Sequence, residues 1–125
     1  MTEPTRTEFL LARIAEDERA ARGTAEPFYE REAYSRRFDS FESDHSDGDR
    51  EFVDRFNPTR VLAECEAKRR IVDLTIAAEQ SMERLGDMPT IRALEEGRAS
   101  LGREMCRALA AVYSDHPDYR QEWKP

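Results

Sequence analysis

The chain has 125 residues, of which 38% are hydrophobic and 38% are charged, and its net charge is -7 at neutral pH. This length is enough to bury a core without disulfides or metals. The excess of acidic residues argues against direct binding to nucleic acid or to an anionic membrane surface, because both attract positive charge. We therefore expect one small domain over residues 1–125 that binds neither.

No segment approaches the roughly 18 uninterrupted apolar residues of a membrane-spanning helix. The opening MTEPTRTEFL also lacks the basic and apolar runs of a secretory signal. These features predict a cytoplasmic protein. Cys65 and Cys106 lie far apart in helical patterns, and we expect both to be buried thiols in a reducing compartment.

The first predicted helix covers about residues 6–22. Thr5 and Glu8 have the spacing of a capping box, in which two side chains satisfy the free amides at a helix start. Glu18 and Arg22 are four residues apart, as in a helical ion pair, and Gly23 is typical of a helix end.

The middle of the chain, residues 25–56, combines seven of the eleven aromatic residues with a dense acidic run. The spacing of its aromatic residues indicates a short helix near 27–41. The acidic run predicts a loop over residues 39–51. The segment REFVDRF that follows is expected to form one or two apolar helical turns, ended by Asn57-Pro58.

Two long helices dominate the prediction. The first begins at Asn57 and Pro58, which suit a helix cap and a first helical position, and ends at Gly86. The second covers about residues 90–114, and its glycines either weaken it or allow close approach to another helix. The long helix that begins at Asn57 has a predicted buried stripe of Leu62, Cys65, Val72, Ile76 and Met82. The long helix over residues 90–114 carries apolar residues at three-four spacing: Ile91, Leu94, Leu101, Met105, Ala108 and Val112.

A short connection makes these two helices antiparallel neighbours. The predicted fold is therefore all-α: a helical hairpin of two long helices, with an N-terminal helix and a packed C-terminal tail.

Two distinctive blocks occur in the chain, NPTRVLAECEAKRRIVD at 57–73 and LAAVYSDHPDYRQEWKP at 109–125. They resemble the blocks of a domain-of-unknown-function family of short proteins from actinobacteria and their phages, with a DPARVL, E, EAKRRI core and a YADHPDYREEWRP ending. The opening EFLLARIAEDERAAR is similar to the first helix of that family. The family has no assigned activity, so the resemblance implies a source and a compartment but no mechanism.

The chain departs from the family pattern just before its first long helix. Family members often carry a histidine pair there, as in HIARHDP, whereas this chain has Phe52 and Phe56. A metal or catalytic role for that pair therefore does not carry over to this chain.

Neither a metal site nor another cofactor site is predicted. The soft metal ligands are Cys65, Cys106, His45 and His116, and no pair of them has the close spacing of a zinc motif. The segment SDHSDGDREFVD resembles a calcium loop around Gly48, but it lacks the leading carboxylates and the final glutamate of such a loop.

The acidic run is the main candidate for binding a partner. Between Asp39 and Asp54 there are seven acidic residues and one arginine, so a basic protein partner is one hypothesis and a solvated loop is the other. Interleaved aromatic residues, Phe56 among them, would give a partner apolar contacts. The candidate residues are Phe38, Phe41, Asp44, Asp47, Asp49 and Phe52.

The ending YSDHPDYRQEWKP allows two interpretations. In one, Asp115 orients His116 as the acid-base group of an enzyme. In the other, a short helix begins near Pro117 and places Tyr119 and Trp123 on one face as an anchor that packs on the rest of the protein. The anchor is favoured, because no nucleophile, pocket or cofactor loop accompanies the histidine.

The sequence thus predicts a small cytoplasmic accessory protein that acts by protein–protein binding. The alternative is an enzyme of unknown reaction that uses Asp115 and His116. A homodimer is compatible with the pattern, and the protein partner itself is not identified by the sequence.

Overall fold

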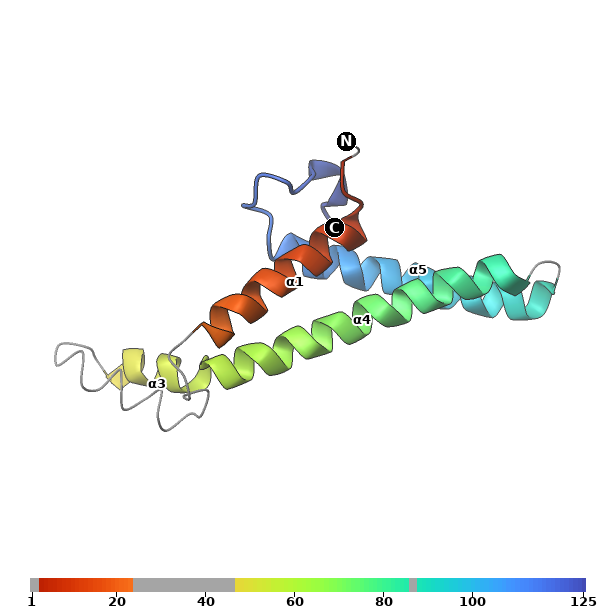
Figure 1. Cartoon of the computed structure of the whole chain (residues 1–125). Helices are drawn as coiled ribbons and strands as arrows, with labels where there is room; N and C mark the ends of the chain where they lie inside the picture. The colour runs from red at the N-terminus through yellow and green to blue at the C-terminus, as the bar shows by residue number, and fades with distance from the viewer. Residues whose placement is uncertain (1–2, 24–46, 86–87) are drawn as a thin grey trace. The chain divides into compact units, whose positions relative to one another are not determined.

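The computed structural model of the chain describes residues 3–23, 47–85 and 88–125. Within these ranges the protein is all-α, with no strand, as predicted (Figure 1). The helices are α1 (Arg6–Arg22), α3 (Asp47–Arg55), α4 (Pro58–Leu85) and α5 (Pro89–Ala111), followed by a short 3-10 helix, η1 (Gln121–Trp123). None of the described helices is both long enough and apolar enough to span a bilayer.

The chain divides into two compact units. One consists of residues 1–14 and 67–125, and the other of residues 15–66. The first holds the start of α1, most of the helical hairpin and the tail, whereas the second holds the rest of α1, α3 and the first turns of α4. The single domain expected over residues 1–125 stays a prediction.

The start of α1 is fixed by the predicted capping box. The Glu8 amide donates to Thr5 Oγ1 and the Thr5 amide donates to Glu8 Oε2, both at 3.2 Å. These bonds satisfy two amides that a helix start leaves without partners. Farther along, Arg22 and Glu18 form the expected pair at 3.6 Å, so the prediction of a helix over residues 6–22 is confirmed.

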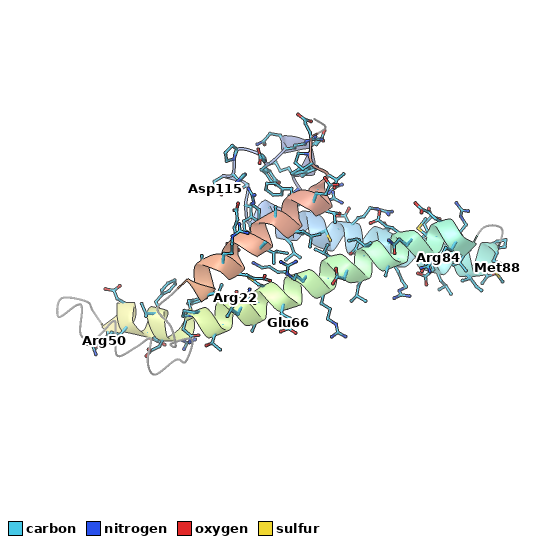
Figure 2. The ribbon with its side chains drawn as sticks, in the orientation of Figure 1. Arg22, Arg50, Glu66, Arg84, Met88 and Asp115 are labelled. Carbon is cyan, nitrogen blue, oxygen red and sulfur yellow. The ribbon has the colours of Figure 1, made fainter. Side chains whose placement is uncertain are left out.

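The helical hairpin is formed by α5 and residues 67–85 of α4, which run in opposite directions (Figure 1). Three cross-helix contacts show this direction: Lys68 Nζ with Tyr113 Oη at 3.3 Å, Cys106 Sγ with Thr75 Oγ1 at 3.5 Å, and Arg103 with Glu79 at 3.7 Å. In these three contacts the residue number on the α4 side rises while the number on the other side falls, as expected for antiparallel helices. Figure 2 shows Arg84 and Met88 on either side of the connection. The predicted hairpin is confirmed.

The close contact between the two helices depends on small residues. The face of α5 that is buried consists of Ala99, Gly102, Cys106 and Ala110. A Cβ built at Gly102 would stand 2.4 Å from Thr75 Oγ1, which is too close for any side chain. Glycine is therefore required at this position, where the backbone of α5 approaches the side chain of Thr75.

The apolar stripe predicted for α5 is not its buried face. The large residues Ile91, Leu94, Leu101, Met105 and Val112 are all exposed, and so is Ala108. The stripe was predicted from the three-four spacing of apolar residues, but a close helix–helix contact selects small side chains that let the backbones approach. The stripe predicted for α4 is closer: Cys65 and Val72 are buried, while Leu62, Ile76 and Met82 are half-buried.

The C-terminal tail is packed, as predicted. Phe9 of α1, Ala110 of α5, Tyr119 and Trp123 form one buried cluster, with Tyr113 at its edge. The Phe9 ring centroid lies 5.1 Å from that of Trp123 and 6.0 Å from that of Tyr119. Aromatic rings at these distances contribute both buried area and favourable edge contacts.

The backbone of the tail differs from the prediction of a helix that begins near Pro117. Residues 112–118 form turns, Arg120 is extended, and helical backbone returns only as η1 from Gln121. Tyr119 and Trp123 still meet edge to face at 5.8 Å. Arg120 and η1 are what lie between the two rings, so an extended residue and a 3-10 turn bring the pair together, and not one α-helix face.

The acidic run begins to be helical earlier than expected. α3 starts at Asp47, so the loop predicted over residues 39–51 is helical where it is described, and a calcium loop around Gly48 is inconsistent with this backbone. Asp47 and Asp49 lie in the first turn, where carboxylates stabilise the positive end of a helix. The helix predicted near 27–41 lies outside the described residues.

Candidate partner-binding site

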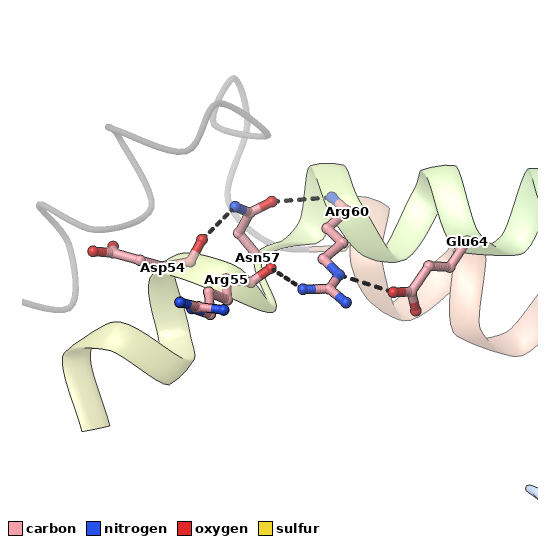
Figure 3. Close-up of polar contacts among 5 residues, drawn as sticks. All are labelled: Asp54, Arg55, Asn57, Arg60 and Glu64. Carbon is pink, nitrogen blue, oxygen red and sulfur yellow. Dashed lines mark hydrogen bonds and ion pairs between the residues drawn. The ribbon is translucent and has the colours of Figure 1, made fainter. Parts of the chain in front are cut away.

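The junction between α3 and α4 is held by Asn57, a buried side chain with hydrogen bonds to both helices (Figure 3). Asn57 Oδ1 accepts from the Arg60 amide at 3.0 Å, which is the predicted cap of α4. Asn57 Nδ2 donates to the carbonyl oxygen of Asp54 at 2.8 Å. One side chain therefore caps the start of α4 and ties it to the end of α3.

Arg60 adds three further contacts at the same junction. Its Nε donates to Glu64 Oε1 at 2.9 Å and its Nη1 donates to the carbonyl oxygen of Arg55 at 3.4 Å (Figure 3). Its guanidinium also lies 4.3 Å from the centre of the Phe56 ring, a cation–π distance. These contacts hold the last turn of α3 and position the Phe56 ring.

Phe52 and Phe56 form a stacked and exposed aromatic pair on this junction. Their ring centroids are 4.6 Å apart with an interplanar angle of 26°. The two residues are 62% and 44% exposed, and α3 has no buried residue. Two adjacent exposed aromatic rings form an apolar patch that a partner can cover. Aromatic anchors dominate the binding energy of many protein interfaces.

The structure places the predicted partner-binding residues as follows. Asp47, Asp49 and Phe52 lie on α3, with the two aspartates in the first turn and Phe52 near the end that meets α4. The other three, Phe38, Phe41 and Asp44, lie outside the described residues. Phe56 was expected among the interleaved aromatic contacts but not among the candidate residues, although its four-residue spacing from Phe52 within REFVDRF is the signal that pairs the two rings.

His116, the centre of the alternative enzyme hypothesis, is half-buried in the tail. An Arg13 guanidinium nitrogen contacts its Nε2, and the Asp118 amide lies 3.0 Å from its Nδ1. The ring also meets Phe9 edge to face at 5.6 Å. Because a neutral imidazole has one acceptor nitrogen, it can accept a hydrogen bond from only one of these two donors at a time.

Asp115 does not complete an acid-base pair with this histidine. Its side chain is exposed in the tail segment after α5 (Figure 2), and no hydrogen bond joins it to His116 in the part of the chain that the structure describes. The contacts of His116 instead connect the tail to α1. A catalytic dyad would need the carboxylate within hydrogen-bond reach of the ring.

The two predicted anchor residues, Tyr119 and Trp123, are both buried. The Tyr119 hydroxyl is also buried, and it has no hydrogen-bond partner among residues 3–23, 47–85 and 88–125. The bulk of the ring, rather than its polar tip, therefore accounts for its place in the cluster with Phe9.

Metal-ligating side chains do not gather in the described ranges, where no group of three or more His, Cys, Asp or Glu residues could hold an ion. Cys65 and Cys106 are both buried thiols, as expected. An open groove near the turn of the hairpin has charged walls, with both acidic and basic residues. It is lined by Glu79, Met82, Glu83, Arg92 and Arg103.

The comparisons with known proteins identify a family for this chain. Residues 3–125 match the model of a family described as "Family of unknown function (DUF6221)". No curated protein matches the chain, and no solved structure does so either. The match covers nearly the whole chain and agrees with the resemblance of its two sequence blocks. The protein is therefore a member of DUF6221, a family of unknown function.

Proposed function

We propose that the protein is a small accessory protein that acts by binding another protein, and that the Phe52–Phe56 pair is its main contact. The observation that carries this proposal is the stacked, exposed pair itself, on a helix with no buried residue. Such a pair gains free energy when a partner covers it, because its apolar area leaves water.

The junction around Asn57 and Arg60 supports this role by fixing the pair before a partner arrives. Phe56 lies under the Arg60 guanidinium, and Asn57 bonds both α3 and α4. Binding then orders few additional side chains, so less conformational entropy is lost on association. A preorganised aromatic pair is typical of the residues that dominate an interface.

The chemistry of the partner follows from the charges on α3. Asp47 and Asp49 occupy the first turn, about one turn before Phe52. A complementary surface has an apolar pocket for the two rings and basic side chains towards the start of α3, which would also speed association. The net charge of -7 fits a basic partner. A cytoplasmic location is part of this proposal.

The test is a capture experiment from an actinobacterial lysate, the source that the sequence resemblance implies. Immobilised wild-type protein, a Phe52→Ser/Phe56→Ser variant and a Met88→Ser variant are compared by quantitative mass spectrometry. Met88 is the matched control, because it is a large exposed apolar residue at the start of α5 and belongs to the other compact unit of the chain.

The proposal predicts a protein that wild type and Met88→Ser retain equally and that the double phenylalanine variant loses. A retained protein that is insensitive to the phenylalanine substitutions contradicts the assignment of this surface. Circular dichroism of the variants checks that they fold. We expect them to do so, because neither phenylalanine is buried.

A further inference from the structure

α5 carries an exposed seam of large apolar residues along its length. The large residues are between 40% and 66% exposed, and together with Ala108 they are spaced three, seven, four, three and four residues apart, where the seven-residue step passes over Arg98. Over about 21 residues such a seam is roughly 32 Å long, and its spacing is that of the a and d positions of a coiled coil. The seam consists of Ile91, Leu94, Leu101, Met105 and Val112, with Ala108 between the last two.

The seam is separate from the surface that holds the hairpin together. The buried face of α5, with Gly102 and Cys106, contacts Thr75 of α4. α5 is thus apolar on two faces, of which the chain uses one. A helix that is apolar on two faces is usually buried on both.

One exposed leucine of α4, Leu74, lies on the same side of the hairpin as this seam. Thr75 of α4 and Gly102 of α5 contact each other, and each is directly preceded by a leucine, Leu74 and Leu101 respectively. Because successive residues of a helix are rotated by about 100° about its axis, each leucine points about 100° away from the contact. Because the two helices are antiparallel and their contacting faces oppose each other, the two leucines point to the same side. Leu74 and the seam therefore form one two-helix surface, called here the open hairpin face.

The charges beside the seam indicate what covers it. Arg98 and Glu104 lie three residues to either side of Leu101, and both are exposed. If two α5 helices pack antiparallel about a two-fold axis at Leu101, Arg98 of each copy lies at the same level along the helices as Glu104 of the other, and its long side chain can extend across towards it. The same arrangement places Leu94 of each copy opposite Ala108 of the other, so the surface is complementary to itself in both charge and size.

We propose that two copies of this chain form a symmetric dimer through the open hairpin face, with their α5 helices antiparallel and crossing at Leu101. Two antiparallel hairpins joined in this way make a four-helix bundle, a common solution for hairpins with one apolar side. In the single chain, Arg98 bonds Glu95 at 3.0 Å. Its guanidinium has five N–H donors, so it can keep this bond and reach Glu104 of the second copy.

The experiment is sedimentation equilibrium on the full chain across a wide range of concentrations. Wild type should show twice the chain mass at high concentration. Leu101→Asp should raise the dimer dissociation constant by about tenfold or more, because two leucines leave the interface and two carboxylates meet at the axis. Ser100→Asp is the matched control. It adds the same charge at the neighbouring exposed position, turned away from the seam, and should dimerise like wild type.

Charge exchange provides the second arm. Arg98→Glu and Glu104→Arg should each weaken the dimer, and the double variant should restore it, because the two symmetric pairs then exist with their signs reversed. A wild-type protein that remains monomeric at every concentration overturns the proposal, as does a dimer that Leu101→Asp leaves intact. A double exchange that fails to restore the dimer overturns the antiparallel arrangement. None of these variants alters α3, so the result is independent of the proposed partner-binding site.

Discussion

Gly102 lies so close to Thr75 that a Cβ at position 102 would stand 2.4 Å from Thr75 Oγ1 and 3.0 Å from Thr75 Cγ2. Gly102→Ala should therefore lower the free energy of unfolding, because overpacking a close contact typically costs about 1 to 3 kcal/mol. Gly97→Ala is the control. A Cβ there meets nothing within 4 Å, so alanine should stabilise α5 by up to about 1 kcal/mol.

Urea unfolding at one fixed protein concentration measures both changes. If Gly102→Ala is as stable as Gly97→Ala, the close contact between α4 and α5 is wrong. Shortening Thr75 to alanine in the Gly102→Ala background should recover part of the loss, because both of the side-chain atoms beyond Cβ that lie near position 102 are then absent. The two substitutions should therefore be non-additive.

Removing the Trp123 ring should destabilise the protein strongly. Trp123 is buried against Phe9 and Tyr119, and truncation of a buried tryptophan typically costs about 3 to 5 kcal/mol. Trp123→Ala should lower the melting temperature markedly, whereas His116→Gln should lower it only mildly, because the glutamine carbonyl can accept a hydrogen bond from Arg13 in place of His116. Gln121→Ala, at an exposed position of η1, is the control.

Trp123 is the only tryptophan, so fluorescence reports its surroundings directly. The native emission should be blue-shifted and should move to longer wavelength on unfolding. Native emission at the wavelength of a water-exposed indole would contradict the packed tail.

Tyr119→Phe should leave stability unchanged or raise it. The Tyr119 hydroxyl is buried and bonds to none of the described residues. A buried polar group without a partner costs about 1 to 3 kcal/mol in lost hydration, and phenylalanine removes the hydroxyl while keeping the ring contacts with Phe9 and Trp123. Thermal unfolding measures the change. A clear loss of stability would mean that the hydroxyl has a partner in the folded protein.

Substitutions of Asn57 should separate its two hydrogen bonds. Asn57→Ala removes both the cap of α4 and the bond to the Asp54 carbonyl, and loss of a helix cap typically costs about 0.5 to 2 kcal/mol. Asn57→Ser keeps a side-chain acceptor for the Arg60 amide and loses the amide donor to the Asp54 carbonyl without adding a charge, so it should cost less than alanine. Equal melting temperatures for the two variants would show that the cap contributes little.

The helices of this protein could be predicted from sequence because their ends carry local signals. The Thr5–Glu8 capping box and the Asn57-Pro58 cap depend on residues within one turn of each other, and both helix starts are confirmed. The antiparallel hairpin followed from the short connection between two long periodic segments.

Which face of α5 is buried could not be predicted in this way. Hydrophobic periodicity identifies large apolar residues, but the contact with Thr75 depends on the absence of a side chain at Gly102. The tail shows a similar limit, because Tyr119 and Trp123 meet through turns and an extended residue, and a four-residue spacing alone indicated a helix. The Gly102–Thr75 contact and the packing of the tail on Phe9 both join segments far apart in the chain, which local spacing does not reveal. The stacking of Phe52 on Phe56 could have been predicted from the sequence, since the two residues are about one helical turn apart.

The proposed function depends on the Phe52–Phe56 pair as the anchor of a protein interface. The most direct measurement is the dissociation constant of the purified partner from the capture experiment, compared among wild type, Phe52→Ala and Met88→Ala by titration calorimetry. An aromatic anchor typically contributes 2 kcal/mol or more, so Phe52→Ala should weaken binding by about thirtyfold or more. Met88→Ala should bind like wild type, and equal dissociation constants for all three proteins would contradict the account.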